Sequence, residues 1–382
     1  MTRRPELDEL RGLMLVLMTC THVPTDYSMW LSQPFGFVSA AEGFVFLSAY
    51  LVGMVYTRMA NTKGIDAMRI GLWRRARLVW FCQVGMLLFL FTMIAQIGLV
   101  TDRQAIKNLI SFYLAEPTDA LWTGLALIYN PPLLDILPMY VLFMLASPVA
   151  LAIGLRRNGW LIVIGVSLVL WLLAQFGLSQ ASYNTIVRAT GLRVPLHETG
   201  AFELVAWQFL WVFGLWLGSR REAIPDRHGF AGWVVAIAIV YAGVCLVWRH
   251  WIGQTPFHDH ELNLLFDKWR LGPLRLFNFF ALLVLVARYG PYVAKRWRFP
   301  VLETLGKASL PVFCAHLVIV LLVLSWIGDN FGLTPLWEDT IVLAMALIGI
   351  YVVALVSNRL DDQSKPSLPT PAPAPATERR AG

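Results

Sequence analysis

Charged residues are scarce in this sequence of 382 residues. Asp, Glu, Lys and Arg together make up 14% of it, whereas hydrophobic residues make up 57%. A typical soluble domain has about 25% charged and about 45–50% apolar residues. The shortage of charge therefore excludes an ordinary soluble domain and indicates a chain that lies largely in lipid.

Cysteine is also scarce. The sequence has four cysteines, all inside apolar segments and without a CxxC pair: Cys20, Cys82, Cys245 and Cys314. We interpret them as small packing residues rather than as disulfides or metal ligands. Metal ligation is conceivable in the segment 258–261 (HDHE), but adjacent ligands without a second cluster are poor evidence. With Trp251 and Trp269 nearby, that loop suits a sugar-facing surface or a membrane-interface anchor. No metal is expected.

Long apolar runs are abundant instead. About ten segments approach the roughly 20 residues that a helix needs to cross the hydrocarbon. The expected spans are 11–30, 36–58, 78–99, 132–154, 158–177, 202–219, 230–249, 272–289, 308–328 and 337–357. No cleavable signal peptide is evident, and no internal repeat is obvious. The predicted fold is an all-α, polytopic membrane domain over residues 1–358, followed by a disordered Pro/Ala-rich tail, 359–382.

The placement of basic residues predicts the orientation. Most of the 31 Lys and Arg residues fall in one alternate set of loops and in the tail. Because Lys and Arg are enriched in cytoplasmic loops, both termini are expected in the cytoplasm. The excess of Lys and Arg in the loops expected in the cytoplasm also accounts for the net charge of +7. No nucleic-acid partner is therefore expected.

The first span carries a polar stripe. In ELRGLMLVLMTCTH, Arg11 and His22 are eleven positions apart, almost three helical turns, so they share one face about 16 Å apart along the axis. Pro24 is expected to kink or end the helix just beyond His22. Ionisable groups at such depth usually face a bundle interior or an aqueous cavity. Two interpretations stay open for each residue. His22 is either a site residue or a structural histidine, and Arg11 is either a site residue or a topological anchor.

The second span contributes a lone carboxylate, Glu42, within SAAEGFVFLS. The loop between the first two spans is short, so these helices are expected to be antiparallel neighbours with Glu42 and His22 at compatible depths. A carboxylate buried in the membrane needs a partner, and His22 is the expected one.

Several motifs together resemble a known family. LDELRG and the Arg11–x10–His22 spacing resemble the start of the acyltransferase-3 membrane proteins. FGFVSAAEGFVFLSAYLVGMVY, LDILPMYVLF and LGKASLPVFCAHLVI are similar to the OpgC branch, the osmoregulated periplasmic glucan succinyltransferases. The resemblance covers residues 5 to about 357. One departure is Ala49, where many members carry Gly; it is expected to affect helix packing rather than chemistry.

The resemblance implies transfer of an acyl group, succinyl in this branch, from cytoplasmic acyl-CoA to a hydroxyl of periplasmic glucan across a bacterial inner membrane. No permanently bound cofactor is implied. A sugar hydroxyl needs a general base, and histidine suits that task near neutral pH. His22 is the candidate base, with Glu42 orienting its ring.

Donor binding calls for cations at the cytoplasmic side, because CoA carries several phosphates. Arg11 and the Arg-x-x-Arg pair Arg74 and Arg77 are the candidates, although positive-inside anchoring explains each of them equally well. Arg275 is a candidate for the free carboxylate of a succinyl group. His316 either assists the site or bonds across helices.

Two alternatives remain at this point. The protein either transfers acetyl to another envelope polysaccharide, or it is a transporter in which Arg11, His22 and Glu42 form a proton or anion path. An acyl-histidine intermediate and direct transfer are both compatible with the sequence.

Overall fold

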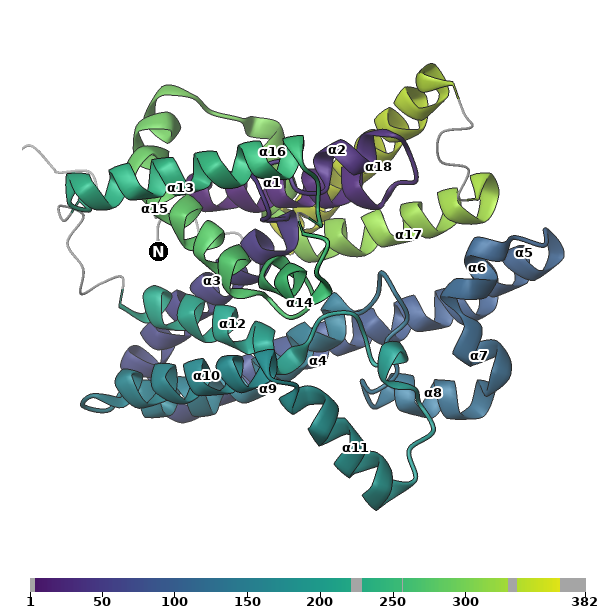
Figure 1. Ribbon diagram of the computed structural model, residues 1–382, viewed down its shortest axis with the longest axis horizontal. Helices are drawn as coiled ribbons and strands as arrows, with labels where there is room; N and C mark the ends of the chain where they lie inside the picture. The colour runs from purple at the N-terminus through teal and green to yellow at the C-terminus, as the bar shows by residue number, and fades with distance from the viewer. Residues whose placement is uncertain (1–3, 221–228, 256, 329–334, 365–382) are drawn as a thin grey trace, which may run out of the picture.

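The computed structural model describes residues 4–220, 229–255, 257–328 and 335–364, and these residues fold into a bundle of helices (Figure 1). Within those ranges the β structure consists of an isolated bridge between Phe35 and Val38. The prediction of an all-α polytopic membrane protein is confirmed.

The long helices are α1 (Pro5–His22), α3 (Ala40–Lys63), α4 (Ile65–Phe89), α9 (Ile136–Gly154), α10 (Gly159–Gln175), α12 (Leu204–Ser219), α13 (Gly232–Trp251), α15 (Pro273–Arg296), α17 (Ser309–Ile327) and α18 (Leu336–Gln363). A π-helical turn, Leu90–Ile94, joins α4 to α5 (Ala95–Val100). The shorter helices are α2 (Tyr27–Leu31), α6 (Gln104–Leu109), α7 (Ser111–Ala115), α8 (Pro117–Leu125), α11 (Leu178–Thr190), α14 (His260–Asn263) and α16 (Pro300–Lys307). Two 3-10 turns are Leu196–Glu198 and Leu264–Phe266.

Each of the ten expected spans overlaps one of the long helices. Within the described residues, seven helices are long and apolar enough to cross a membrane, and an eighth crosses if α10 and α11 form one broken span. These two helices are bent by 82° relative to each other. The helix α12 is apolar but has 16 residues, and α1 carries four charged residues in its first half.

The observed ends of the first and the last helix agree with the sequence-based prediction to different degrees. The helix α1 ends at His22, as expected from Pro24, which cannot continue the backbone hydrogen bonding. At the other end, α18 continues to Gln363, five residues past the expected domain boundary. The predicted disordered tail from residue 365 onward lies outside the described residues.

Glycines allow two pairs of helices to meet backbone to backbone. A Cβ at Gly12 of α1 would lie 2.0 Å from the carbonyl oxygen of Leu302 in α16, and one at Gly218 of α12 would lie 2.0 Å from that of Tyr50 in α3. Ala49 also lies in the second contact, where its Cβ would be 2.7 Å from a Cβ at Gly214. Ala49 thus bears on helix packing, as expected.

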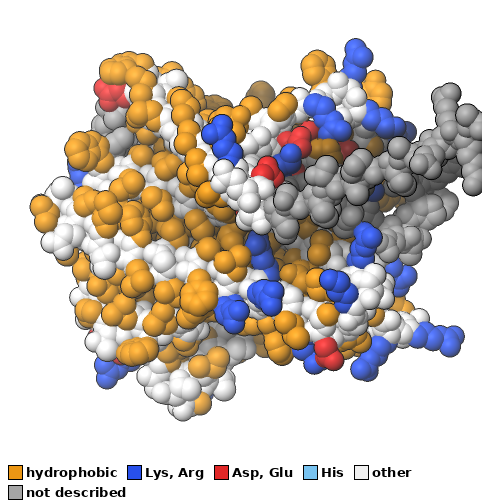
Figure 2. All heavy atoms as spheres, turned by 180° about the vertical axis from the view of Figure 1, so that it is seen from behind, with side chains coloured by type: hydrophobic (Ala, Val, Ile, Leu, Met, Phe, Trp, Pro, Cys, Tyr) orange, Lys and Arg blue, Asp and Glu red, His pale blue; other side chains and the backbone are white. Residues whose placement is uncertain are grey.

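The surface has an apolar expanse and a basic end. Figure 2 shows hydrophobic side chains spread over the face seen there, with Lys and Arg side chains gathered toward one end of the molecule. This distribution suits helices that cross lipid with their basic loops on one side.

Candidate active site

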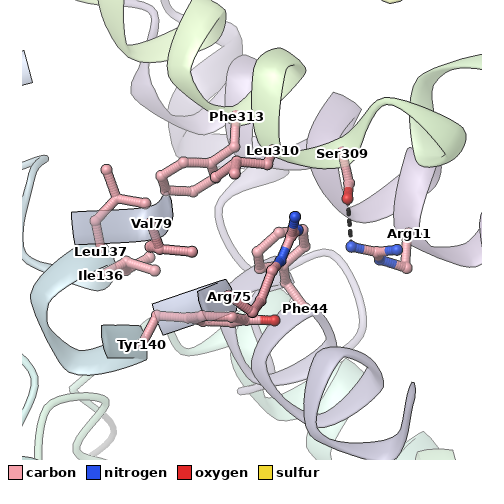
Figure 3. Close-up of a pocket in the computed structure, with 10 residues that line it drawn as sticks. All are labelled: Arg11, Phe44, Arg75, Val79, Ile136, Leu137, Tyr140, Ser309, Leu310 and Phe313. Carbon is pink, nitrogen blue, oxygen red and sulfur yellow. Dashed lines mark hydrogen bonds between the residues drawn. The ribbon is translucent and has the colours of Figure 1, made fainter. Parts of the chain in front are cut away.

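A small, partly open pocket lies between α1, α3, α4, α9 and α17. Its lining combines two guanidinium groups and two hydroxyls with apolar side chains: Arg11, Phe44, Arg75, Val79, Ile136, Leu137, Tyr140, Ser309, Leu310 and Phe313. We call it the arginine pocket. Figure 3 shows Arg11 and Ser309 at one end and Val79, Leu137 and Phe313 at the other.

Arg11 and Arg75 bring positive charge to this pocket from two different helices. Arg11 donates a hydrogen bond from Nη2 to the hydroxyl of Ser309. Arg75 is half-buried, whereas Arg74 and Arg77 are exposed and do not line the pocket. The reason is helical geometry: successive residues turn by about 100°, so one position along the chain changes the face. Of the cations expected to bind a donor, the pocket holds Arg11, and it adds Arg75.

Two stacked aromatic rings line the pocket. Phe44 and Phe313 stack with centroids 5.6 Å apart and planes 17° apart. The ring of Phe313 also contacts His316 edge-on, at 4.8 Å between centroids. Phe313 therefore contacts both the pocket and His316.

His22 and His316 form a pair beyond this ring. Nδ1 of His22 lies 3.3 Å from Nε2 of His316, and the rings stack at 5.5 Å. His316 is fully buried, whereas His22, at the last position of α1, is half-buried. Because one proton is shared between the two facing nitrogens, the hydrogen bond fixes the tautomers of both rings relative to each other.

Glu42 has partners other than the expected His22. Its Oε1 forms an ion pair with Nε of Arg275 in α15, and both side chains are buried. Its Oε2 accepts hydrogen bonds from the backbone N–H of Ser39, at 3.0 Å, and from the Ser39 hydroxyl. Glu42 thus forms a capping box at the start of α3. Within the described ranges, no hydrogen bond or ion pair joins Glu42 to His22.

Two loop residues extend the charge around Glu42 and Arg275. The ammonium group of Lys268 lies within electrostatic range of Glu42, Arg275 and Asp135. Burial lowers the pKa of Lys268 and the charge of Arg275 lowers it further, while the two carboxylates oppose the shift. Burial raises the pKa of Asp135 to about 6, although the N–H of Ala201 and the charge of Lys268 act against that rise.

We call Glu42, Arg275, Lys268 and Asp135 the charged cluster. Lys268 also lies within electrostatic range of His22, one member of the histidine pair. Lys268 comes from the loop that follows the HDHE segment, and only its three-dimensional position shows that it belongs to the cluster. Among the described residues no group of three His, Cys, Asp or Glu could hold a metal ion.

One comparison with known proteins decides the family. A family model described as OpgC protein matches residues 3–362, nearly the whole chain. The chain belongs to the OpgC family. No match was found among curated proteins or among solved structures. OpgC membership indicates a glucan-modifying acyltransferase in general terms, and the apolar helices make this OpgC protein a multi-pass membrane protein.

Proposed function

We propose that this protein transfers an acyl group, succinyl in the first instance, from acyl-CoA in the cytoplasm to hydroxyl groups of periplasmic glucan, in a bacterial inner membrane. The observation that carries the proposal is the order of its polar groups. The arginine pocket, the stacked rings of Phe44 and Phe313 and the histidine pair follow one another along α1, α4 and α17.

The arginine pocket is the proposed entrance of the donor. CoA ends in phosphates, which guanidinium groups bind well, and continues as an uncharged arm that carries the thioester. Arg11 and Arg75 meet the phosphate end, and Phe44, Val79 and Phe313 meet the arm. The exposed Arg74 and Arg77 remain candidates for phosphate contacts outside the pocket.

His22 is the proposed general base, with His316 as its orienting partner. When Nδ1–H of His22 donates to Nε2 of His316, Nε2 of His22 carries the free lone pair. The sugar oxygen attacks the thioester carbon while its proton moves to that Nε2. The C–S bond breaks, and the proton is passed on to the CoA sulfur. The products are a sugar ester and free CoA thiol.

The charged cluster is the proposed binding site for the carboxylate at the far end of a succinyl group. Arg275 uses Nε for Glu42 and one further nitrogen, Nη1, for the carbonyl oxygen of Phe266. Its Nη2 is buried and has no hydrogen-bond partner among the described residues. A carboxylate there gains a charge-assisted hydrogen bond that an acetyl group has no means to form.

Vesicles that contain the purified protein test the proposal. Labelled succinyl-CoA is added on the arginine-pocket side and glucan on the other, and mass spectrometry detects the ester. We expect product from the unchanged protein and a loss of at least 100-fold in His22→Ala, as for removal of a general base. His197→Ala, at an exposed histidine, is the matched control and retains activity.

The alternatives give other results in the same vesicles. A transporter moves solute and forms no ester. An acetyltransferase uses acetyl-CoA in preference to succinyl-CoA. Full activity of a folded His22→Ala protein would refute the mechanism.

A further inference from the structure

Gln83 is a buried amide without a hydrogen-bond partner. It lies in α4 with none of its surface exposed. Neither its Nε2 nor its Oε1 has a partner among the described residues. Buried polar groups in proteins are almost always paired, so an unpaired one asks for an explanation such as a missing ligand. In the sequence the residue is a lone amide in the apolar run LVWFCQVGMLLFLF.

The position of Gln83 continues the wall of the arginine pocket. Arg75 and Val79 line that pocket from α4, and Gln83 follows at the same four-residue spacing. Positions four apart on a helix lie on the same side, about 6 Å apart along the axis. Gln83 therefore faces the same side of α4 as the pocket, one turn beyond its apolar end.

The helix α17 reaches the same level with His316. Ser309 and Phe313 line the pocket opposite Arg75 and Val79, and His316 follows Phe313 by three residues, about 4.5 Å further along the axis. The thiols of Cys82 and Cys314 interact, so the two helices are neighbours at this height. Gln83 and the histidine pair therefore border the same region, next to the ring of Phe313.

We propose that the side-chain amide of Gln83 binds the carbonyl oxygen of the acyl thioester next to the histidine pair. This inference rests on the proposed function. A thioester that enters through the arginine pocket passes the rings of Phe44 and Phe313 and brings its carbonyl to the level of Gln83. When the sugar oxygen attacks, negative charge develops on that carbonyl oxygen. A fixed N–H donor in a dry site stabilises this charge more strongly than it stabilises the uncharged thioester.

Gln83→Met separates this role from a structural one. Methionine has a similar length and volume but no hydrogen-bonding groups, so it removes an unpaired buried amide. If the amide has no part in catalysis, Gln83→Met is expected to have an equal or higher apparent Tm and unchanged activity. The proposal predicts the same Tm result together with a kcat about 100-fold lower and a KM for succinyl-CoA that is little changed.

Tyr129→Phe is the matched control. The hydroxyl of Tyr129 is likewise buried and unpaired in the described chain, but its ring packs against Phe91 and Phe112 and lines no part of the pocket. We expect its kcat to equal that of the unchanged protein. Gln83→Asn keeps the amide but shortens its reach by one carbon, and we expect it to lower kcat as well.

The outcomes separate this inference from the proposed function. If the unchanged protein transfers neither succinyl nor acetyl from CoA, the proposed function fails. If it transfers acyl groups and Gln83→Met keeps full kcat, the inference about Gln83 alone is overturned. A Gln83→Met protein that does not fold would also overturn it, because the amide would then serve the fold.

Discussion

Removing Arg275 is expected to destabilise the protein strongly. The substitution Arg275→Met removes the ion-pair partner of the Glu42 carboxylate. Both groups of the pair are buried, with 1% of the Arg275 side chain and 0% of the Glu42 side chain exposed. Breaking a buried pair by removing one partner costs about 3–5 kcal/mol, because the remaining charge is uncompensated. The two hydrogen bonds from Ser39 and the nearby charge of Lys268 remain. We therefore expect the lower end, about 3 kcal/mol, or about two decades in the folding equilibrium.

Urea unfolding in detergent, followed by tryptophan fluorescence, measures this loss. Arg69→Met is the matched control, since Arg69 pairs with Asp66 at 3.5 Å on an exposed surface and such pairs contribute little. The double variant Arg275→Met, Glu42→Gln removes both charges and is expected to recover most of the loss. The reasoning is refuted if Arg275→Met costs no more than Arg69→Met, or if the double variant is no more stable than the single one.

Three further predictions concern pH, packing and donor binding. Burial raises the pKa of Asp135 from 3.8 to about 6, so the folded protein holds a proton that the unfolded chain releases. Stability therefore falls as pH rises from about 4 to about 6, and thermal unfolding should show a flatter pH profile for Asp135→Asn. Gly12→Ala should lower the apparent Tm, because its Cβ would meet the carbonyl oxygen of Leu302 at 2.0 Å; Gly243→Ala, with open space around it, should not. Arg75→Gln should raise the KM for succinyl-CoA about tenfold, and more than Arg77→Gln does; equal effects would place the phosphates outside the arginine pocket.

The helices could be predicted from the sequence because each one is a local pattern. A run of about 20 apolar residues needs helical hydrogen bonds to lie in lipid, and this rule locates all ten long helices. The end of α1 at His22 follows equally well from Pro24, which blocks the next turn.

The partners of the buried polar groups could not be predicted, because they depend on which helices become neighbours. Nearness in sequence suggested His22 for Glu42, but the carboxylate pairs with Arg275, 233 positions away. His316 is 294 positions from His22. The choice between Arg74, Arg75 and Arg77 depends on how α4 is rotated, which the packing of the whole bundle decides. The roles of these residues in catalysis remain predictions.

The stack of Phe44 and Phe313 has a consequence for the cell as well as for the reaction. Any protein that lets reagents from two compartments meet inside a bilayer risks becoming a leak for ions, and a leak would dissipate the gradient that the membrane maintains. The stacked rings of Phe44 and Phe313 line the arginine pocket, and Phe313 also contacts His316 of the histidine pair. We expect the rings that the acyl chain passes in the proposed function also to slow ion leakage through the resting protein.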